Sequence, residues 1–484
     1  MRRAFGVSGF FGVPGSRTMG AVTVGVAVIA TAAAGLALSG PVSPDPARAG
    51  AGVVIRPGTV QLERETRTGP SDTLQCQRAL RIDCYNPSQL QQAYDLPSLY
   101  ARGITGRGVT IVIVDPYGSP TIASDLRTFD STESIPNPPS LRIIRPAGRV
   151  PSFSPGSTTM AGWASETTLD VEYAHTIAPG ARILLVETPG GGRTGGVSMA
   201  QVVTAEQYVI AHHLGDVISQ SFVATEQGIG YAGIAPLRAA YLDAYRHHVT
   251  VLTGSGDTGA AGLEPDGTSY YTYPVTGWPA SDPLVTAVGG TRLQLDAAGR
   301  RDAADTVWND TYSSTASRLV DGNNGPDPLA GGGGKSVIFG RPSYQNVVKA
   351  IVGNHRGVPD ISMSAACTGA VNVYQSFAAA RTGWYALCGT SEATPLFAGI
   401  VALADQVAGH PLGLINPALY QLAAAHAPGI VRVTSGKNTV SFRQNDRIRT
   451  VPGFSARPGY SLAAGLGTVN AAYLVPELAR LAGR

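Results

Sequence analysis

The chain has 484 residues, of which 43% are hydrophobic and 14% are charged. A chain of this length and apolar content can bury one large core or two ordinary ones, so we predict a globular protein. Because its charged share is well below the roughly 25% of an average protein, protonating its carboxylates at low pH would create less repulsion than usual, which suits an acidic milieu.

Residues 1–49 have the pattern of an export signal. Arg2 and Arg3 precede an uncharged run over residues 19–40, and Ala47-Arg48-Ala49 offers small residues for cleavage. The run is nearly long enough to span a bilayer, so retention as an N-terminal anchor is the alternative. Removing this segment takes four arginines and one aspartate from the 36 basic and 33 acidic residues and leaves 32 of each. That balance argues against a nucleic-acid partner.

An N-terminal arm is predicted after the signal. Residues 50–75 are polar and show no clear hydrophobic period, which is typical of a loosely held segment. We therefore divide the chain into the signal or anchor (1–49), an extended arm (50–83) and one domain (84–484).

The four cysteines fall into two close pairs, Cys76 with Cys84 and Cys367 with Cys388. In an exported chain four cysteines permit three disulfide pairings, of which the two local ones are the simplest. A zinc site is the alternative, but neither pair has the two-residue spacing of zinc ligands and no histidine pattern lies nearby. A Cys367–Cys388 bridge would brace the strand that leads to Ser391.

Apolar β-branched runs alternate with helical segments in the first half of the domain. The predicted strands are residues 109–114, 183–186, 217–221 and 249–252, and the clearest helices between them are residues 197–214 and 236–247. The first run ends in Asp115, as a buried parallel strand entering a loop does. This alternation predicts an α/β fold with a mostly parallel central sheet and helices on both faces. In such sheets the active-site residues usually lie at the carboxyl ends of the strands.

Two carboxylates share a face of the helix predicted over residues 165–177. At about 100° per residue, Glu166 and Asp170 lie in the same narrow arc as Tyr173 and Ile177, whereas Glu172 points nearly the opposite way. A solvated helix face would more naturally group both acids with Glu172. We therefore favour a functional, electrostatically coupled carboxylate pair over a solvated one.

Glycine-rich loops follow the later strands. Asp257 lies in the loop 254–259 directly after the run 249–252, where a simple turn aspartate is the alternative. Residues 315–336 are rich in Gly, Asn, Asp and Pro. They lack the glycine spacing of a phosphate loop, so we predict a binding loop of another kind.

Ser391 is the candidate nucleophile. A helical pattern begins at Gly389-Thr390-Ser391 and continues through Leu396 to Ala408, so the serine falls in the first turn, near free backbone donors and the positive end of the helix dipole. A plain capping serine is the alternative. None of the eight histidines lies in a glycine-framed catalytic loop. A carboxylate must therefore act as the base, which works at acidic pH.

Together these segments resemble the sedolisins, the serine-carboxyl peptidases with a subtilisin-like fold, from about Cys84 to Leu474. The resemblance rests on six segments in the family's order: ETTLDVEYAH at 166–175, GSGDTG at 254–259, PAS at 279–281 with VGGT at 288–291, GGGGKS at 331–336 with PSYQ at 342–345, VPDIS at 358–362, and GTSEATP at 389–395. Any one of these segments alone would be weak evidence for the resemblance, but six of them in the same order are not explained by coincidence.

The resemblance implies a role for each residue of the candidate site. Ser391 would be the nucleophile, Glu166 the general base and acid, and Asp170 the group that orients Glu166. Asp257 would donate a hydrogen bond to the oxyanion through a protonated carboxyl, together with backbone N–H groups near Ser391. In some members an acid near the position of Asp115 joins the same network.

The sequence departs from the family in three places. The smallest is Phe222, which follows the strand ending at Ser221 where the family more often has tryptophan. Only the short arm stands where the family usually has a large N-terminal prodomain, which puts control by a folded prodomain in doubt. At the family's calcium site, Arg432 and Ser461 stand where aspartates are expected, and a guanidinium repels a cation. We expect no bound metal and no cofactor there.

These features and the resemblance predict a secreted serine-type peptidase, either an endopeptidase or a tripeptidyl-peptidase, that hydrolyses unfolded polypeptides at acidic pH. We expect it to act as a monomer and to have no nucleic-acid partner. A catalytically silent relative that binds peptides in the same cleft is the alternative, although such a protein would have no reason to retain all four site residues. The protein would contact a membrane only if residues 1–49 remain as an anchor.

Overall fold

The structure is a computed structural model, and it describes residues 54–55, 58–66, 69–190, 197–378 and 382–482. The predicted signal or anchor, residues 1–49, lies outside the described residues. In the described part of the chain no helix is both apolar enough and long enough to cross a membrane.

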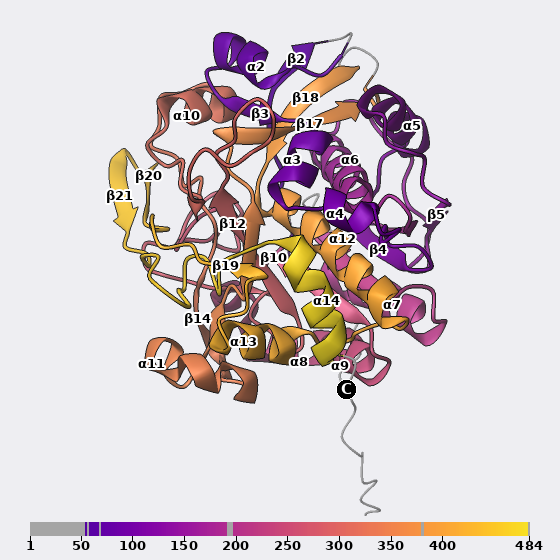
Figure 1. The fold of residues 1–484 in the computed structure, drawn as a ribbon. Coiled ribbons are helices and arrows are strands. Elements are labelled where there is room, and N and C mark those ends of the chain that lie inside the picture. Colours follow the sequence, from indigo (N-terminus) through magenta and orange to yellow (C-terminus); the bar gives the residue numbers. More distant parts are fainter. Residues whose placement is uncertain (1–53, 56–57, 67–68, 191–196, 379–381, 483–484) are drawn as a thin grey trace, which may run out of the picture. The chain divides into compact units, whose positions relative to one another are not determined.

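A central sheet organises the chain (Figure 1). Among the described residues it has eight strands in the order β13-β12-β10-β8-β4-β6-β5, with β16 paired to β12. Every pairing is parallel except that of β13 with β12. The predicted strands are confirmed as β4 (Thr110–Pro116), β6 (Arg182–Thr188), β8 (Val217–Gln220) and β10 (Thr250–Gly254), and the others are β5 (Leu141–Ile144), β12 (Thr286–Arg292), β13 (Thr306–Val307) and β16 (Ile361–Ser364).

Both faces of this sheet are buried. In β4, Ile111 and Ile113 belong to one hydrophobic core, whereas Val112 and Val114 belong to another. Successive side chains of a strand point to opposite faces, so the two cores lie on opposite sides of the sheet. A continuous β-branched run is the pattern that such a doubly covered strand requires.

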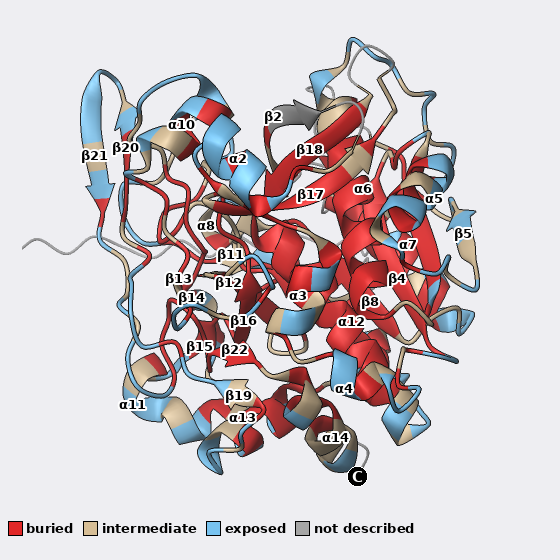
Figure 2. Ribbon diagram, turned by 45° about the horizontal axis from the view of Figure 1, so that its top comes forward, coloured by how far each residue is buried: buried red, intermediate tan, exposed pale blue. Residues whose placement is uncertain are grey.

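Helices supply the outer layer on each face. On the first face are α6 (Thr158–Ile177), α12 (Thr390–Ala408) and α14 (Ala471–Ala482), and on the second are α7 (Met199–Ala211), α8 (Glu226–Leu237) and α9 (Ala239–Arg246). In Figure 2 the ribbons of α6 and α12 are buried for most of their length. The predicted α/β class with helices on both faces of a mostly parallel sheet is therefore confirmed.

A second sheet lies at the start of α12, in the order β2-β18-β17-β3. Its strands are β2 (Val60–Thr66), β18 (Gly383–Cys388), β17 (Gly369–Gln375) and β3 (Asp83–Tyr85). The prediction of a loosely held arm is therefore wrong for residues 60–66, because they form β2, which pairs antiparallel with β18. Both local disulfides are confirmed, Cys76–Cys84 beside β3 and Cys367–Cys388 at the end of β18.

The remaining elements connect or cover these sheets. The strands are β1 (Val54–Ile55), β7 (Val197–Ser198), β9 (Ala224–Thr225), β11 (Gly277–Trp278), β14 (Gly334–Gly340), β15 (His355–Val358), β19 (Ile430–Val431), β20 (Val440–Gln444), β21 (Arg447–Val451) and β22 (Thr468–Val469). The helices are α2 (Thr73–Ala79), α3 (Pro87–Ala93), α4 (Pro97–Tyr100), α5 (Ile122–Glu133), α10 (Ser314–Asp321), α11 (Lys349–Val352), α13 (Asn416–Ala424) and the 3-10 helix η1 (Ser343–Val348).

Candidate active site

Ser391 is the second residue of α12 and is 1% exposed. The helix begins after Gly389, whose φ of 123° lies in the region that favours glycine. A Cβ built on Gly389 would lie 2.7 Å from Asp257 Oδ2, so only glycine leaves room for that carboxyl. Ser391 Oγ makes no hydrogen bond of normal geometry, which leaves the hydroxyl free to react.

Helix α6 carries Glu166 and Asp170, and Glu166 lies next to Ser391. Both side chains are fully buried. Glu166 lies close enough to Ser391 for the hydroxyl to affect its pKa, and Asp170 Oδ1 accepts a hydrogen bond of 2.9 Å from Ser221 Oγ. Ser221 directly follows β8, so the serine that orients Asp170 comes from the carboxyl end of a central strand.

Glu172 lies on the opposite side of α6, as predicted, but it does not face solvent. Its side chain is fully buried and accepts a hydrogen bond of 3.2 Å from the backbone N–H of Tyr374 in β17. The second sheet covers this side of the helix, so α6 is buried nearly all round. The direction of each side chain is as predicted, but the helical period did not indicate that Glu172 is buried as well.

Burial also raises the pKa values of Glu166 and Asp170. It raises the pKa of Glu166 to about 7, although donors from Ser391 and Thr59 act in the opposite direction. Burial and then the neighbouring charges of Asp115 and Glu166 raise the pKa of Asp170 well above its usual range. The three carboxyls therefore titrate as one coupled group rather than independently.

Asp115, at the carboxyl end of β4, is the third member of this group. Both its oxygens are buried without a hydrogen-bond partner of normal geometry, close to the Thr167 hydroxyl. Burial raises the pKa of Asp115 well above its usual range, and the charges of Glu166 and Glu187 add to the effect. The expected contact between Asp115 and the carboxylate network is present as this electrostatic coupling.

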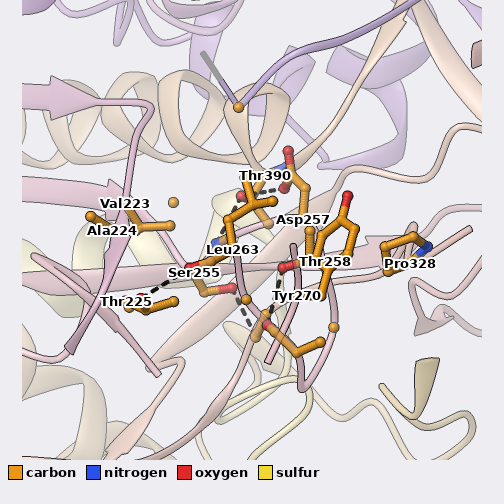
Figure 3. Close-up of a pocket in the computed structure, with 18 of the residues that line it drawn as sticks. Val223, Ala224, Thr225, Ser255, Asp257, Thr258, Leu263, Tyr270, Pro328 and Thr390 are labelled. Carbon is orange, nitrogen blue, oxygen red and sulfur yellow. Dashed lines mark hydrogen bonds between the residues drawn. The ribbon is translucent and has the colours of Figure 1, made fainter. Parts of the chain in front are cut away.

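Asp257 joins the site from the loop after β10. Its Oδ1 accepts two hydrogen bonds of 2.7 Å, from the backbone N–H and from the hydroxyl of Thr390. Figure 3 shows these bonds as dashed lines beside the cleft. Burial raises the pKa of Asp257 to about 7 despite both donors. Oδ2 has no partner, so a proton on that oxygen can be donated to a ligand.

A cleft of about 340 Å³ opens beside Asp257. The wall labelled in Figure 3 combines the apolar Val223, Leu263 and Pro328 and the ring of Tyr270 with polar residues that include Ser255, Thr258 and Thr390. The predicted binding loop 315–336 contributes Pro328, Leu329, Gly332 and Gly333 to this wall, while its first residues form helix α10 instead of a loop. The cleft therefore offers apolar surface beside Asp257 and Thr390, the residue directly before Ser391.

The N-terminal segment itself passes over Ser391. A Cβ built on Gly58 would lie 2.6 Å from Ser391 Oγ and 3.5 Å from Asp257 Oδ2. The backbone N–H of Thr59 donates to Glu166 Oε2 at 2.6 Å. A peptide backbone therefore already lies against three of the four predicted site residues.

Comparison with known proteins agrees with this geometry. Residues 156–417, more than half of the chain, match the Subtilase family. The chain belongs to the subtilase family. The match begins before Glu166 and ends beyond Ser391, so it contains Glu166, Asp170, Asp257 and Ser391 but not Thr59 or Asp115.

Individual relatives identify the sedolisin branch of this family. Kumamolisin from Bacillus sp. (strain MN-32) is 34% identical over 393 residues, which cover 79% of this chain and 62% of the relative. Sedolisin from Pseudomonas sp. (strain 101) is 26% identical over 396 residues, covering 81% and 60%, and human tripeptidyl-peptidase 1 is 26% identical over 328 residues, covering 65% and 51%. The chain thus spans less than two thirds of the length of these relatives.

A solved structure gives the same fold. Pseudomonas sedolisin, described as a serine-carboxyl proteinase complexed with two molecules of pseudo-iodotyrostatin, superposes with a TM-score of 0.67 at 24% identity. The superposition covers 83% of this chain and 99% of that one. The predicted sedolisin resemblance and the subtilisin-like fold are confirmed.

The calcium site implied by the family does not fit the residues of this subtilase. Arg432 is exposed, and its guanidinium lies 2.8 Å from His426 Nδ1. Ser461 and Gly465 exchange two backbone hydrogen bonds of 2.9 Å, which occupies one of the carbonyls a metal would use. Within the described residues, no group of three or more His, Cys, Asp or Glu side chains could hold a metal ion.

Sequence reasoning missed three groups in this subtilase site. Ser221 and Thr390 lie inside segments that were recognised, but no role was predicted for their hydroxyls. Thr59 lies in the predicted arm, where the polar, aperiodic sequence gives no sign of a contact with Glu166. A glycine-framed loop next to a serine is the only signal that could have drawn attention to Thr390.

Proposed function

We propose that this subtilase is a secreted serine-type peptidase that hydrolyses unfolded polypeptides at acidic pH. Ser391 is the nucleophile, Glu166 the base, Asp170 its orienting partner and Asp257 the oxyanion donor. The observation that carries the proposal is the convergence of Glu166 and Asp257 on an unpartnered Ser391 Oγ at the start of a buried helix. The names of the relatives, sedolisin and tripeptidyl-peptidase among them, support a peptidase.

The first chemical step transfers the proton of Ser391 to Glu166 as Oγ attacks the substrate carbonyl carbon. A carboxylate is a weak base in water, but burial has raised the pKa of Glu166 to about 7, which brings it closer to the pKa of the group it must deprotonate. Asp170 is electrostatically coupled to Glu166, whose charge raises the pKa of Asp170, and Ser221 holds Asp170 in place through a hydrogen bond of 2.9 Å. Positioned proton transfer of this kind contributes about 10²–10⁴-fold to rate.

The second requirement is a donor for the oxyanion that develops on the substrate. Asp257 Oδ2 carries the proton for this donation, since Thr390 occupies Oδ1. First-turn N–H groups of α12 and the positive end of its dipole add to the stabilisation. Asp257 must stay protonated, so activity is lost as the pH rises through its pKa of about 7.

The site and the disulfides support action at acidic pH and outside the cytosol. The working form needs Glu166 ionised and Asp257 protonated. Because the two buried carboxyls interact, they lose their protons in two steps, and the state that holds one proton lies below the second step and disappears above neutrality. Two disulfides fit an oxidising compartment outside the cytosol. An apolar cleft suits substrates that present an unfolded chain to it.

Hydrolysis of a denatured protein, followed from pH 3 to pH 8, tests the proposal in the wild type and in Ser391→Ala. We expect cleavage on the acid side only, and none by Ser391→Ala at an unchanged melting temperature. Peptide binding without cleavage at any pH would instead support the catalytically silent alternative. Equal cleavage by Ser391→Ala would overturn the nucleophile assignment.

A further inference from the structure

The hairpin of β20 and β21 lies in a strongly basic segment of the chain. Residues 431–460 contain six basic residues and one acid, and taking these from the 32 of each that follow residue 49 leaves 26 basic and 31 acidic residues elsewhere. A local excess of one sign attracts ligands of the opposite charge. The six basic residues, all exposed or half-buried, are Arg432, Lys437, Arg443, Arg447, Arg449 and Arg457, and the acid is Asp446.

The base of this hairpin is fixed to the wall of the cleft. Val440 belongs to one hydrophobic cluster with Ala260 and Ala261, and the backbone N–H of Ala260 donates to the carbonyl of Asn438 at 3.0 Å. Ala261 lines the cleft and follows the loop that carries Asp257. The position of the hairpin is therefore set by the same segment that positions Asp257.

One face of the hairpin contacts Tyr270, which lines the cleft. The ring of Phe442 lies 4.8 Å from the ring of Tyr270, and the side chain of Gln444 accepts from the Tyr270 N–H at 2.8 Å and donates to the Tyr270 carbonyl at 3.3 Å. In β21, Arg449 is opposite Phe442 and Arg447 is opposite Gln444. Residues directly opposite each other share a face, with Cβ atoms about 4.5–5.5 Å apart. Both arginines therefore lie on the face that contacts the wall of the cleft.

The charges of these two arginines are not neutralised within the protein. Among the described residues no ion pair includes Arg447 or Arg449, and Asp446 at the turn is paired with neither. Arg449 Nε is buried without a hydrogen-bond partner of normal geometry, a state that costs free energy until an acceptor arrives. Arg447 is exposed, and Figure 2 shows β21 exposed over most of its length. A guanidinium presents two parallel donors that match a carboxylate.

We infer that Arg447 and Arg449 bind an acidic side chain of the polypeptide substrate while a neighbouring part of the same substrate lies in the cleft. The inference rests on the proposed peptidase function and adds a substrate preference to it. One polypeptide can carry both parts, so binding at the cleft raises the effective concentration of the acid at the hairpin. A polypeptide is favoured over a nucleic acid because the arginines adjoin the cleft and acids outnumber bases in the rest of the chain. The arginines lie away from the reacting atoms, so the preference belongs to KM rather than kcat.

A matched pair of peptides tests the preference with the full chain. Both peptides have the same cleavable apolar core, flanked on each side by three glutamates in one and by three glutamines in the other. A glutamate side chain has a pKa of about 4.3, so it is mostly ionised at pH 5 and mostly neutral at pH 3. At pH 5 and low salt we expect kcat/KM to be about fivefold higher for the glutamate peptide, the effect of one good exposed ion pair, through a lower KM. The preference should vanish at pH 3 and in high salt.

Two double variants locate the preference. Arg447→Gln with Arg449→Gln should hydrolyse the two peptides with equal kcat/KM. Arg246→Gln with Arg480→Gln removes the same charge from exposed positions on α9 and α14 and should keep the preference. Melting temperatures verify that both variants fold. Equal kcat/KM for the two peptides in the wild type, or an undiminished preference in Arg447→Gln with Arg449→Gln, would overturn the inference.

Binding to Ser391→Ala separates this inference from the proposed function. At pH 5 this variant should bind a labelled glutamate peptide more tightly than the glutamine peptide, again by about fivefold, and adding Arg447→Gln and Arg449→Gln should remove the difference. If the wild type cleaves neither peptide at any pH while the binding difference is present, the proposed function fails and the acidic preference stands. Cleavage of both peptides without a binding difference refutes the preference alone. Tighter binding of a single-stranded oligonucleotide than of the glutamate peptide would assign the hairpin to nucleic acid and overturn the inference.

Discussion

Asp257 and Thr390 are joined by two hydrogen bonds of 2.7 Å that end on the same carboxyl oxygen. This arrangement fixes the plane of the carboxyl and leaves Oδ2 beside Gly58 and Gly389, with no partner of its own. The strand-end loop after β10 is thereby tied to the first residue of α12. The contact therefore both positions Asp257, the proposed oxyanion donor, and aligns the start of the helix that carries Ser391, the proposed nucleophile.

Asparagine at position 257 should preserve more activity than alanine. Its Oδ1 can accept both bonds from Thr390 and its Nδ2 can donate to the oxyanion, whereas alanine removes both functions. We expect Asp257→Ala to lose about 10²–10³-fold in kcat, the usual cost of removing an oxyanion donor. Asp257→Asn should be more active than Asp257→Ala, and its rate should persist above pH 7 because an amide does not ionise.

The pH–rate profiles of these two variants and the wild type provide the measurement. If Asp257→Asn is as inactive as Asp257→Ala at every pH, an amide N–H cannot replace the carboxyl O–H as the donor to the oxyanion.

Glu166 and Glu172 should separate catalysis from stability. Glu166→Gln removes the base and should lower kcat by at least about 10²-fold, with little change in melting temperature. Glu172→Ala leaves the buried N–H of Tyr374 without its acceptor and should cost about 1–3 kcal/mol of unfolding free energy. Its kcat at low temperature should be unchanged.

Denaturant unfolding and initial rates on the same preparations measure both effects, and Glu172→Gln, which keeps an acceptor oxygen, is the matched control. Loss of kcat in Glu172→Ala with normal rates in Glu166→Gln would reverse the assignment of the two faces of α6.

Stability should fall as the pH rises from about 4 to about 8. Glu206 is fully buried without a hydrogen-bond partner of normal geometry for either oxygen, and burial raises its pKa to about 8. The native state therefore holds a proton that the unfolded chain releases near pH 4.5, so the stabilisation is complete below that pH and is lost as the pH rises through 8. The full difference is on the order of 4 kcal/mol for this one group.

Glu206→Gln should flatten the dependence of melting temperature on pH, since the amide has no proton to lose. The same sign applies to Glu166 and Asp257, whose pKa values are both raised to about 7. A wild type that melts at a higher temperature at pH 8 than at pH 5 would contradict this prediction.

How much of the site could be predicted follows from what each residue depends on. The directions of Glu166 and Asp170 depend only on the helical period, and Ser391 on the start of a local apolar pattern, so all three were accessible from the sequence. The burial of Glu172 depends instead on β17, which covers the far side of α6. A helical period gives the direction of a side chain and says nothing about what packs there.

The contact of Thr59 with Glu166 was inaccessible for a related reason. Residues 60–66 contain no strand pattern strong enough to stand alone, and they become β2 because β18 offers a free edge. The pairing joins Val60 to Cys388, which lies 328 residues further along the chain. Pairings at such separation are determined by the assembled fold rather than by local sequence.

The last prediction is that calcium chelation leaves this protein's stability unchanged. A metal bound only to the native state stabilises it by mass action, so a chelator lowers the melting temperature of a protein that holds one. Calcium needs several oxygen ligands, with carboxylates supplying the negative charge. Here Arg432 places a guanidinium next to His426, and the loop from Ser461 to Gly465 is closed by its own backbone hydrogen bonds.

Melting curves with excess chelator and with millimolar calcium should therefore coincide. The double variant Arg432→Asp with Ser461→Asp restores two carboxylates and removes the repelling cation, so its melting temperature should rise when calcium is added, while magnesium at the same concentration should act less because it requires a tighter octahedral shell. Arg432→Gln with Ser461→Ala is the control, since it removes the cation without adding charge. A calcium-dependent rise in the wild type would show that neutral carbonyls alone bind the metal, and no rise in the double aspartate variant would show that the loop itself is closed to it.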